Sequence, residues 1–224
     1  MAAAAPPPGW HADPQDQRRW RWWDGARWTE HVSAGPSALW SADYLVIRAS
    51  ARVARWSATI HDRAMARIGS VAQSGLRLHL LDAAGAPLLA LDGGSGVSVR
   101  VQGGLRTWTV TDPAGAHVGE LSVVKYFNRR ITLALRAGGA GAGSLQPIGK
   151  VDRDFSVTDA SGAQVARVWR AERDRSLLTE DETWAAEISR PLAPPLDRLA
   201  LAAVCTLDAI QHVVQSSRST SRFD

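Results

Sequence analysis

The chain has 224 residues, of which 45% are apolar and 21% charged, and its formal net charge at pH 7 is +4. This composition is typical of a soluble globular protein and excludes a collagen-like or wholly disordered chain. The single cysteine, Cys205, excludes an intrachain disulfide and a zinc site built from several cysteines. No secretion signal is recognisable at the N-terminus, and the apolar run at 199–207 is about half as long as a bilayer span. We therefore predict a cytoplasmic protein.

The N-terminal segment is unusually rich in tryptophan, because six of the ten tryptophans lie within the first 40 residues. Asp24-Gly25 stands between aromatic runs and predicts a hairpin, since glycine accepts the positive φ of a tight turn. So short a segment has little core, and stacked tryptophans must supply most of its stability. We predict a small β-hairpin module at residues 1–32 and a linker at 33–43.

The motif of this module is Pro-Gly-Trp at 8–10, Asp-Pro at 13–14 and Trp-Asp-Gly-x-x-Trp-Thr at 23–29. It resembles the actinobacterial module called domain of unknown function 2510, a family that implies no activity. Two interpretations of its aromatic side chains stay open. They form the core of the module, or they form a surface that binds a proline-rich protein segment or a glycan. For the second interpretation the candidate ligand-binding residues are Trp22, Trp23 and Trp28.

From residue 44 onward the chain repeats a unit in which apolar residues lie two positions before an aspartate and six and nine positions after it. The aspartates of the four copies are Asp62, Asp82, Asp112 and Asp159. An aspartate at the start of a turn binds its own backbone, and a glycine three positions later accepts the required dihedral angles. Each copy therefore predicts a β-hairpin. In the first copy Met65 replaces the glycine, which predicts a turn of another type there.

Residues between these hairpins alternate in polarity, so we predict about twelve short strands, with a loose connection at 138–143. A long meander leaves exposed edges unless the sheet closes, which favours a barrel. Residues 196–215 have helical spacing and are apolar almost all round, so this helix must be surrounded. We predict a mainly β fold at residues 44–215, a closed antiparallel barrel around a central apolar C-terminal helix. A disordered tail is expected at 216–224.

Residues 184–210 hold a strand, a proline-rich connection and the helix, and they resemble the end of bacterial scramblase-family proteins. The Asp-x-x-Gly hairpins fit the same family. The resemblance covers residues 44 to about 214 and implies the tubby C-terminal fold of phospholipid scramblases and LURP-one-related proteins. The calcium motif proposed for scramblases is represented here only by Asp181 and Glu182, whereas calcium takes six to eight oxygen ligands. We therefore expect no cofactor, and calcium control is not supported.

No catalytic constellation is recognisable, because Cys205 lies mid-helix among apolar residues and the histidines of the barrel region stand singly. Two basic clusters are the candidate lipid head-group sites. The first holds Lys125, Tyr126, Phe127, Arg129 and Arg130, and the second holds Arg170, Arg173 and Arg175. Cations beside aromatic rings suit a membrane surface, where the charges meet lipid phosphates. The alternative interpretation is a set of solvated surface arginines.

The sequence thus predicts a non-enzymatic, scramblase-like protein that binds or redistributes lipids as a peripheral protein at the inner face of the cell membrane. Its predicted partner is an anionic phospholipid or membrane surface, and no nucleic acid is expected. The alternative hypothesis is an adaptor, in which the Trp-rich module binds a protein or glycan and the barrel is a platform for a partner.

Overall fold

A computed structural model describes residues 9–33, 37–52, 55–93, 106–127, 130–150, 153–175 and 179–220. The chain divides into two compact units, residues 1–41 and residues 42–224.

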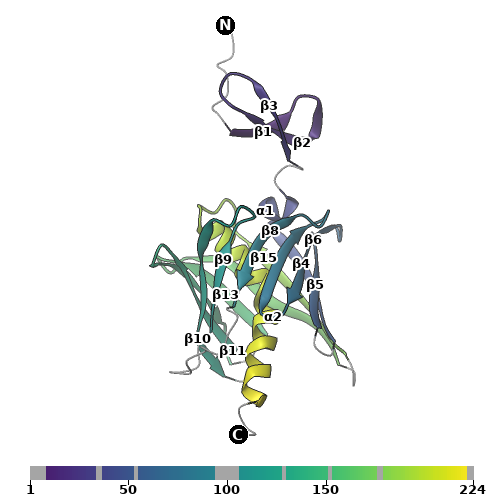
Figure 1. Cartoon of the computed structure of the whole chain (residues 1–224). Coiled ribbons are helices and arrows are strands. Elements are labelled where there is room, and N and C mark those ends of the chain that lie inside the picture. The colour runs from purple at the N-terminus through teal and green to yellow at the C-terminus, as the bar shows by residue number, and fades with distance from the viewer. Residues whose placement is uncertain are drawn as a thin grey trace. The chain divides into compact units, whose positions relative to one another are not determined.

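The N-terminal unit is built on a three-stranded antiparallel sheet of β1 (Gly9–Asp13), β2 (Asp16–Trp23) and β3 (Trp28–Ser33) (Figure 1). A carboxylate oxygen of Asp24 accepts hydrogen bonds of 2.8 Å from the backbone N–H groups of Ala26 and Arg27, and Gly25 has a φ of 100°. These contacts form the predicted hairpin between β2 and β3. A short helix, α1 (Ala38–Ser41), lies within the predicted linker.

The second unit contains a closed barrel of twelve described strands, as predicted. The strands are β4 (Tyr44–Arg52), β5 (Arg55–His61), β6 (Arg67–Ser74), β7 (Arg77–Asp82), β8 (Pro87–Asp92), β9 (Thr107–Thr111), β10 (His117–Phe127), β11 (Arg130–Ala137), β12 (Ala140–Pro147), β13 (Asp154–Asp159), β14 (Gln164–Arg175) and β15 (Thr179–Ile188). Each pairs antiparallel with its neighbours in sequence, and β15 closes the barrel against β4, where Trp184 lies opposite Ile47.

The four repeated aspartates form the predicted hairpin turns. At Asp112, one carboxylate oxygen accepts hydrogen bonds from Ala114 N at 3.0 Å and from Ala116 N at 2.9 Å, and Gly115 has a φ of 82°. The prediction of a different turn around Met65 is wrong. Met65 has a φ of 63°, and its N–H donates to the Asp62 carbonyl at 3.0 Å, as the glycines of the other copies do. The hydrogen bonds of Asp62 hold a residue with a Cβ in the left-handed region.

The predicted loose connection at 138–143 is also wrong for residues 140–143, because β12 begins at Ala140. Gly143 pairs with Asp159 of β13, and a Cβ at Gly143 would clash with the carbonyl oxygen of Thr158. The glycine therefore allows β12 and β13 to approach each other, so it belongs to the sheet.

The C-terminal helix, α2 (Leu196–Thr220), packs against barrel strands that include β5, β7, β10, β11 and β12. Every residue from 199 to 207 is at most 2% exposed, so the helix is surrounded, as its apolar sequence predicted. Residues 216–220 are helical instead of part of a disordered tail, and residues 221–224 lie outside the described residues.

Two contacts show in which direction α2 runs through the barrel. Leu199 of α2 lies so close to Gly119, near the start of β10, that a Cβ added at Gly119 would contact the Leu199 side chain. Asp208 of α2 accepts a hydrogen bond from Trp56, near the start of β5. Because the strands alternate in direction, the Asp-initiated turns lie at the end where α2 begins. The strands β4, β6, β10 and β12 end at the opposite end of the barrel, which we call the helix-exit end (Figure 1).

Candidate functional site

The first basic cluster lies at the helix-exit end, where β10 ends. A register shift between Val123 and Lys125 lets successive side chains near the end of the strand reach solvent. Phe127 is 64% exposed, Lys125 is exposed and Tyr126 is half-buried. Phe127 pairs across the hairpin with Arg130, while Arg129 lies outside the described residues. The structure thus places Lys125, Phe127 and Arg130 at the end of one hairpin, with the Phe127 ring exposed.

Arg130 extends this site to a second turn. Its Nη2 donates a hydrogen bond of 2.7 Å to the carbonyl oxygen of Gly149, in the connection between β12 and β13. Ile148 and Lys150, on either side of that glycine, are both exposed. We did not predict these two residues as part of a site. The signal in the sequence is the spacing, because an isoleucine and a lysine lie two residues apart, as Phe127 and Lys125 do.

The second basic cluster does not form a head-group surface around Arg170, and this part of the prediction is wrong. The Arg170 side chain is 4% exposed, and its Nε lies 3.1 Å from a carboxylate oxygen of Glu182. Its guanidinium carbon lies 4.7 Å from the centre of the Trp184 ring. Arg170 is therefore committed to a buried ion pair and a cation–π contact inside the barrel.

The other two arginines of the second cluster, and Arg167 just before it on β14, differ from Arg170. Arg173 and Arg175 lie on β14 opposite Glu182 and Glu180, but their side chains lie outside those the structure describes. Arg167, two residues from Trp169, is half-exposed and binds both oxygens of Asp154, at 3.0 and 2.6 Å. The hydrogen bonds to this carboxylate raise the pKa of Arg167. Because its charge is already paired, Arg167 is not a free cation for a lipid phosphate.

Asp181 and Glu182, the residues that matched the start of the scramblase calcium motif, do not converge. Glu182 is buried beside Arg170, whereas Asp181, the preceding residue on β15, is exposed. Successive residues of a strand face opposite sides of the sheet. The two carboxylates therefore do not share one ion, and the described residues contain no group of three or more His, Cys, Asp or Glu side chains that could hold a metal.

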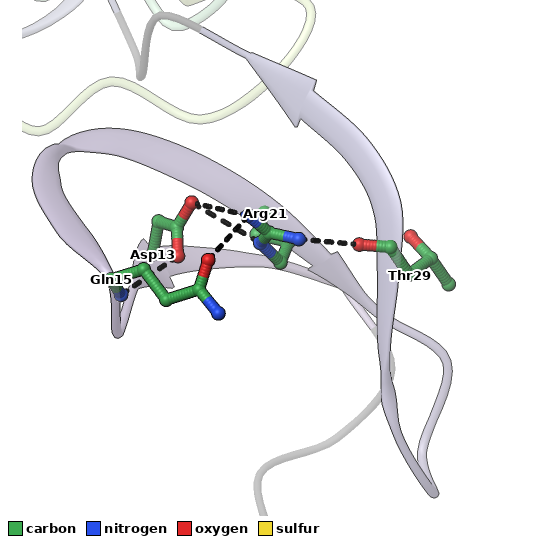
Figure 2. A network of polar contacts seen from close by, with 4 residues as sticks. All are labelled: Asp13, Gln15, Arg21 and Thr29. Carbon is green, nitrogen blue, oxygen red and sulfur yellow. Dashed lines mark hydrogen bonds and ion pairs between the residues drawn. The ribbon is translucent and has the colours of Figure 1, made fainter.

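The Trp-rich module has a polar centre (Figure 2). Asp13 is buried, and its carboxylate oxygen accepts hydrogen bonds from Nε and Nη2 of Arg21 at 3.1 and 3.0 Å. Arg21 also donates to the Thr29 carbonyl and the Gln15 side chain, both at 3.3 Å, so it joins β2 to β3 and to the turn after β1. Sequence reasoning missed this role, although Asp13 belongs to the motif of the module.

The tryptophans proposed as ligand-binding residues are placed only in part. Trp23 and Trp28 lie opposite each other on β2 and β3, with ring centres 5.1 Å apart in an edge-to-face arrangement, and both are half-buried. The Trp22 side chain lies outside those described. The contact between the rings supports the interpretation that Trp23 and Trp28 stabilise the module, and their partial exposure leaves the ligand-binding interpretation open.

No described helix is both long enough and apolar enough to cross a membrane. Residues 8–39 match the model of the family described as protein of unknown function DUF2510. No curated protein matches the chain. A crystal structure of an Arabidopsis thaliana protein, of LURP-one-related or tubby-like type, is similar with 16% identity over 75% of this chain and 93% of that chain, and a TM-score of 0.46.

Proposed function

We propose that this protein is a non-enzymatic, peripheral lipid-binding protein that attaches to anionic membrane surfaces, at the inner face of the cell membrane, through residues 125–127 at the end of β10. The observation that carries the proposal is the exposure of Phe127, 64%, beside the exposed Lys125. Phe127 is the most exposed large apolar side chain among the described residues, and an exposed aromatic ring beside a cation fits an interface between water and lipid.

The expected affinity follows from the two contributions at this site. Burial of a phenylalanine side chain contributes about 1.5–3 kcal/mol when complete, and a cation near an anionic membrane contributes about 1 kcal/mol. Their sum is a few kcal/mol, so the protein should bind reversibly, and binding should weaken as salt screens the charges. This site supports lipid binding and gives no support to lipid redistribution.

Sedimentation of the full chain with vesicles tests the proposal. We expect binding to vesicles of phosphatidylcholine with phosphatidylserine, weaker binding at high salt, and little binding to phosphatidylcholine alone. Phe127→Ser and Lys125→Glu should each reduce binding. Met65→Ser is the matched control, because Met65 is 44% exposed but lies in a turn at the opposite end of the barrel. If the wild-type protein stays in the supernatant with both kinds of vesicle, the proposal is wrong.

The alternative adaptor role is favoured by the separate sheet and the buried Asp13–Arg21 pair of the Trp-rich module, which give the module an internal structure of its own. Binding of proline-rich peptides or oligosaccharides to the full chain, measured by nuclear magnetic resonance shifts of the indole N–H groups, tests that role. Shifts confined to this module would support the adaptor hypothesis, and unchanged spectra would contradict it for these ligands.

A further inference from the structure

We propose that residues 125–127 at the end of β10 and residues 148–150 after β12 form one composite docking edge, in which Phe127 and Ile148 enter the head-group region of an anionic bilayer together and Lys125 and Lys150 contact its phosphates. The inference rests on the proposed function and extends its site. It adds a second insertion point, and it orients the barrel with its helix-exit end toward the membrane.

A direct contact holds the two segments together. β11 pairs with β10 on one side and with β12 on the other, so both segments lie at the same end of adjacent strands. The bond from Arg130 to the Gly149 carbonyl, 2.7 Å, then ties the start of β11 to the middle of the second segment. The bonded carbonyl belongs to the residue between Ile148 and Lys150. The position of these two residues relative to Phe127 is therefore set by a hydrogen bond from a charged donor.

Exposed apolar side chains gather at this edge. Among the described residues, the large apolar side chains that are most exposed are Met65 at 44%, Val124 at 44%, Phe127 at 64% and Ile148 at 39%. Three of these four lie after β12 or on the last residues of β10. Single exposed apolar residues are ordinary on protein surfaces, but a cluster beside cations marks an interaction site.

The distribution of lysine points to the same edge. The chain has 26 basic residues, and only two of them, Lys125 and Lys150, are lysines. Both are exposed, and each lies two residues from an exposed apolar side chain, Phe127 or Ile148. A lysine keeps its ammonium group in the head-group layer while its alkyl chain follows the apolar side chain inward. Two carboxylates follow Lys150 within four residues. Asp154 is already bound by Arg167, and Asp152 lies outside the described residues.

The positive charge of the lysines at this edge favours an anionic partner. Two exposed lysines that form no ion pair with another described residue complement an anionic surface, and the exposed side chains of Phe127 and Ile148 suit insertion between head groups. A protein partner is the competing occupant, and it would not require phosphatidylserine.

Labelled cysteine variants of the full chain measure insertion at each point. The native Cys205 is 1% exposed, so an environment-sensitive fluorophore will label only an introduced thiol. We expect the emission of the label to shift to the blue in Phe127→Cys and in Ile148→Cys on addition of vesicles that contain phosphatidylserine. The label in Met65→Cys, at the opposite end, should not respond. We also expect Ile148→Ser, like Phe127→Ser, to lower the vesicle partition coefficient about tenfold. Lys150→Glu should reduce the salt dependence of vesicle binding.

The outcomes separate this inference from the proposed function. A response at residue 127 without one at residue 148, with unchanged partitioning of Ile148→Ser, overturns the composite edge and leaves the site at residues 125–127 intact. Silence of both labels while the wild-type protein still sediments with vesicles overturns the edge and that site together. Absence of wild-type binding contradicts the proposed function itself.

Discussion

The indole Nε1 of Trp56 on β5 donates a hydrogen bond of 2.7 Å to a carboxylate oxygen of Asp208 on α2, across 152 residues of sequence. Trp56 is buried, and Asp208 is a partly exposed residue of α2 between the buried residues Leu207 and Ala209. The bond therefore joins the wall of the barrel to a polar position within an otherwise buried stretch of the helix. It fixes the depth to which α2 is inserted, because an apolar helix in an apolar barrel has little else to set its position along the axis.

Removal of this acceptor should destabilise the barrel. Asp208→Ala leaves a buried indole N–H without its partner, and the loss of a hydrogen bond to a charged group costs about 1.5–3 kcal/mol. We expect a decrease of that size in the free energy of unfolding, measured by urea denaturation. Asp208→Asn is the control, because it keeps a carbonyl acceptor and should lose less. Equal stability of wild type and Asp208→Ala would show that the contact does not position the helix.

The hairpins and the helix were predictable because their signals are local. An aspartate followed three residues later by a glycine specifies a turn through contacts within five residues, and the turns at Asp82, Asp112 and Asp159 form as expected. The apolar sequence at 199–207 has no polar face, so its burial follows from composition alone. Closure of the barrel was predictable for the same reason. A closed barrel surrounds the apolar helix, and it also leaves the sheet without exposed edges.

The candidate site was less predictable, because a sequence cluster is not a surface cluster. Arg170 lies near Arg173 and Arg175 in sequence, but it pairs with Trp184 and points into the barrel beside Glu182. The burial of Arg170 could have been predicted from the alternation of the strand. Residues two apart share a face, and Val168, two residues before Arg170, is buried. The contact from Arg130 to Gly149 joins segments 19 residues apart, and no local pattern specifies it.

A charge in the middle of α2 tests whether the barrel depends on its helix. Leu207 is 1% exposed, so Leu207→Asp places an unpaired carboxylate in an apolar interior. The cost is several kcal/mol, comparable with the whole stability of a domain. We expect the variant to lose its β signal in circular dichroism and its cooperative thermal transition. Leu207→Met, which keeps the volume and polarity, should fold. A soluble Leu207→Asp with a native spectrum and an unchanged melt would contradict the helix-in-barrel structure.

The left-handed conformation of Met65 offers a stabilising substitution. The left-handed region lowers the stability of the folded state by about 1–2 kcal/mol for a residue with a Cβ. A glycine lowers it by about 0.5–1 kcal/mol, because its unfolded state is more flexible. Met65→Gly should therefore raise the free energy of unfolding by about 0.5–1 kcal/mol, measured by urea denaturation. The reciprocal control is Gly115→Ala, at a φ of 82° with no atom within 4 Å of the added Cβ, so only backbone strain acts. If Met65→Gly is less stable and Gly115→Ala unchanged, the strain argument fails.

The thiol of Cys205 should make the stability of the barrel sensitive to high pH. Burial raises the pKa of Cys205 from its usual 9.0 to about 12. The folded state therefore holds the proton more tightly than the unfolded state does. The stabilisation from the neutral buried thiol is complete below pH 9 and is lost as the pH rises toward 12, because the unfolded state ionises first.

The size of this effect follows from the difference between the two pKa values. One pKa unit corresponds to about 1.4 kcal/mol, so near pH 11 the wild-type protein should have lost about 3 kcal/mol of stability through this group. Cys205→Ala removes the thiol, and the difference between the urea stability curves of the two proteins isolates its contribution from other groups that titrate in this range. We expect the wild type to lose stability relative to Cys205→Ala as the pH rises above about 9. The thiol should also fail to react with a disulfide reagent at neutral pH until urea unfolds the chain. Parallel stability curves, or rapid reaction of the native thiol, would show that Cys205 is not enclosed by the barrel.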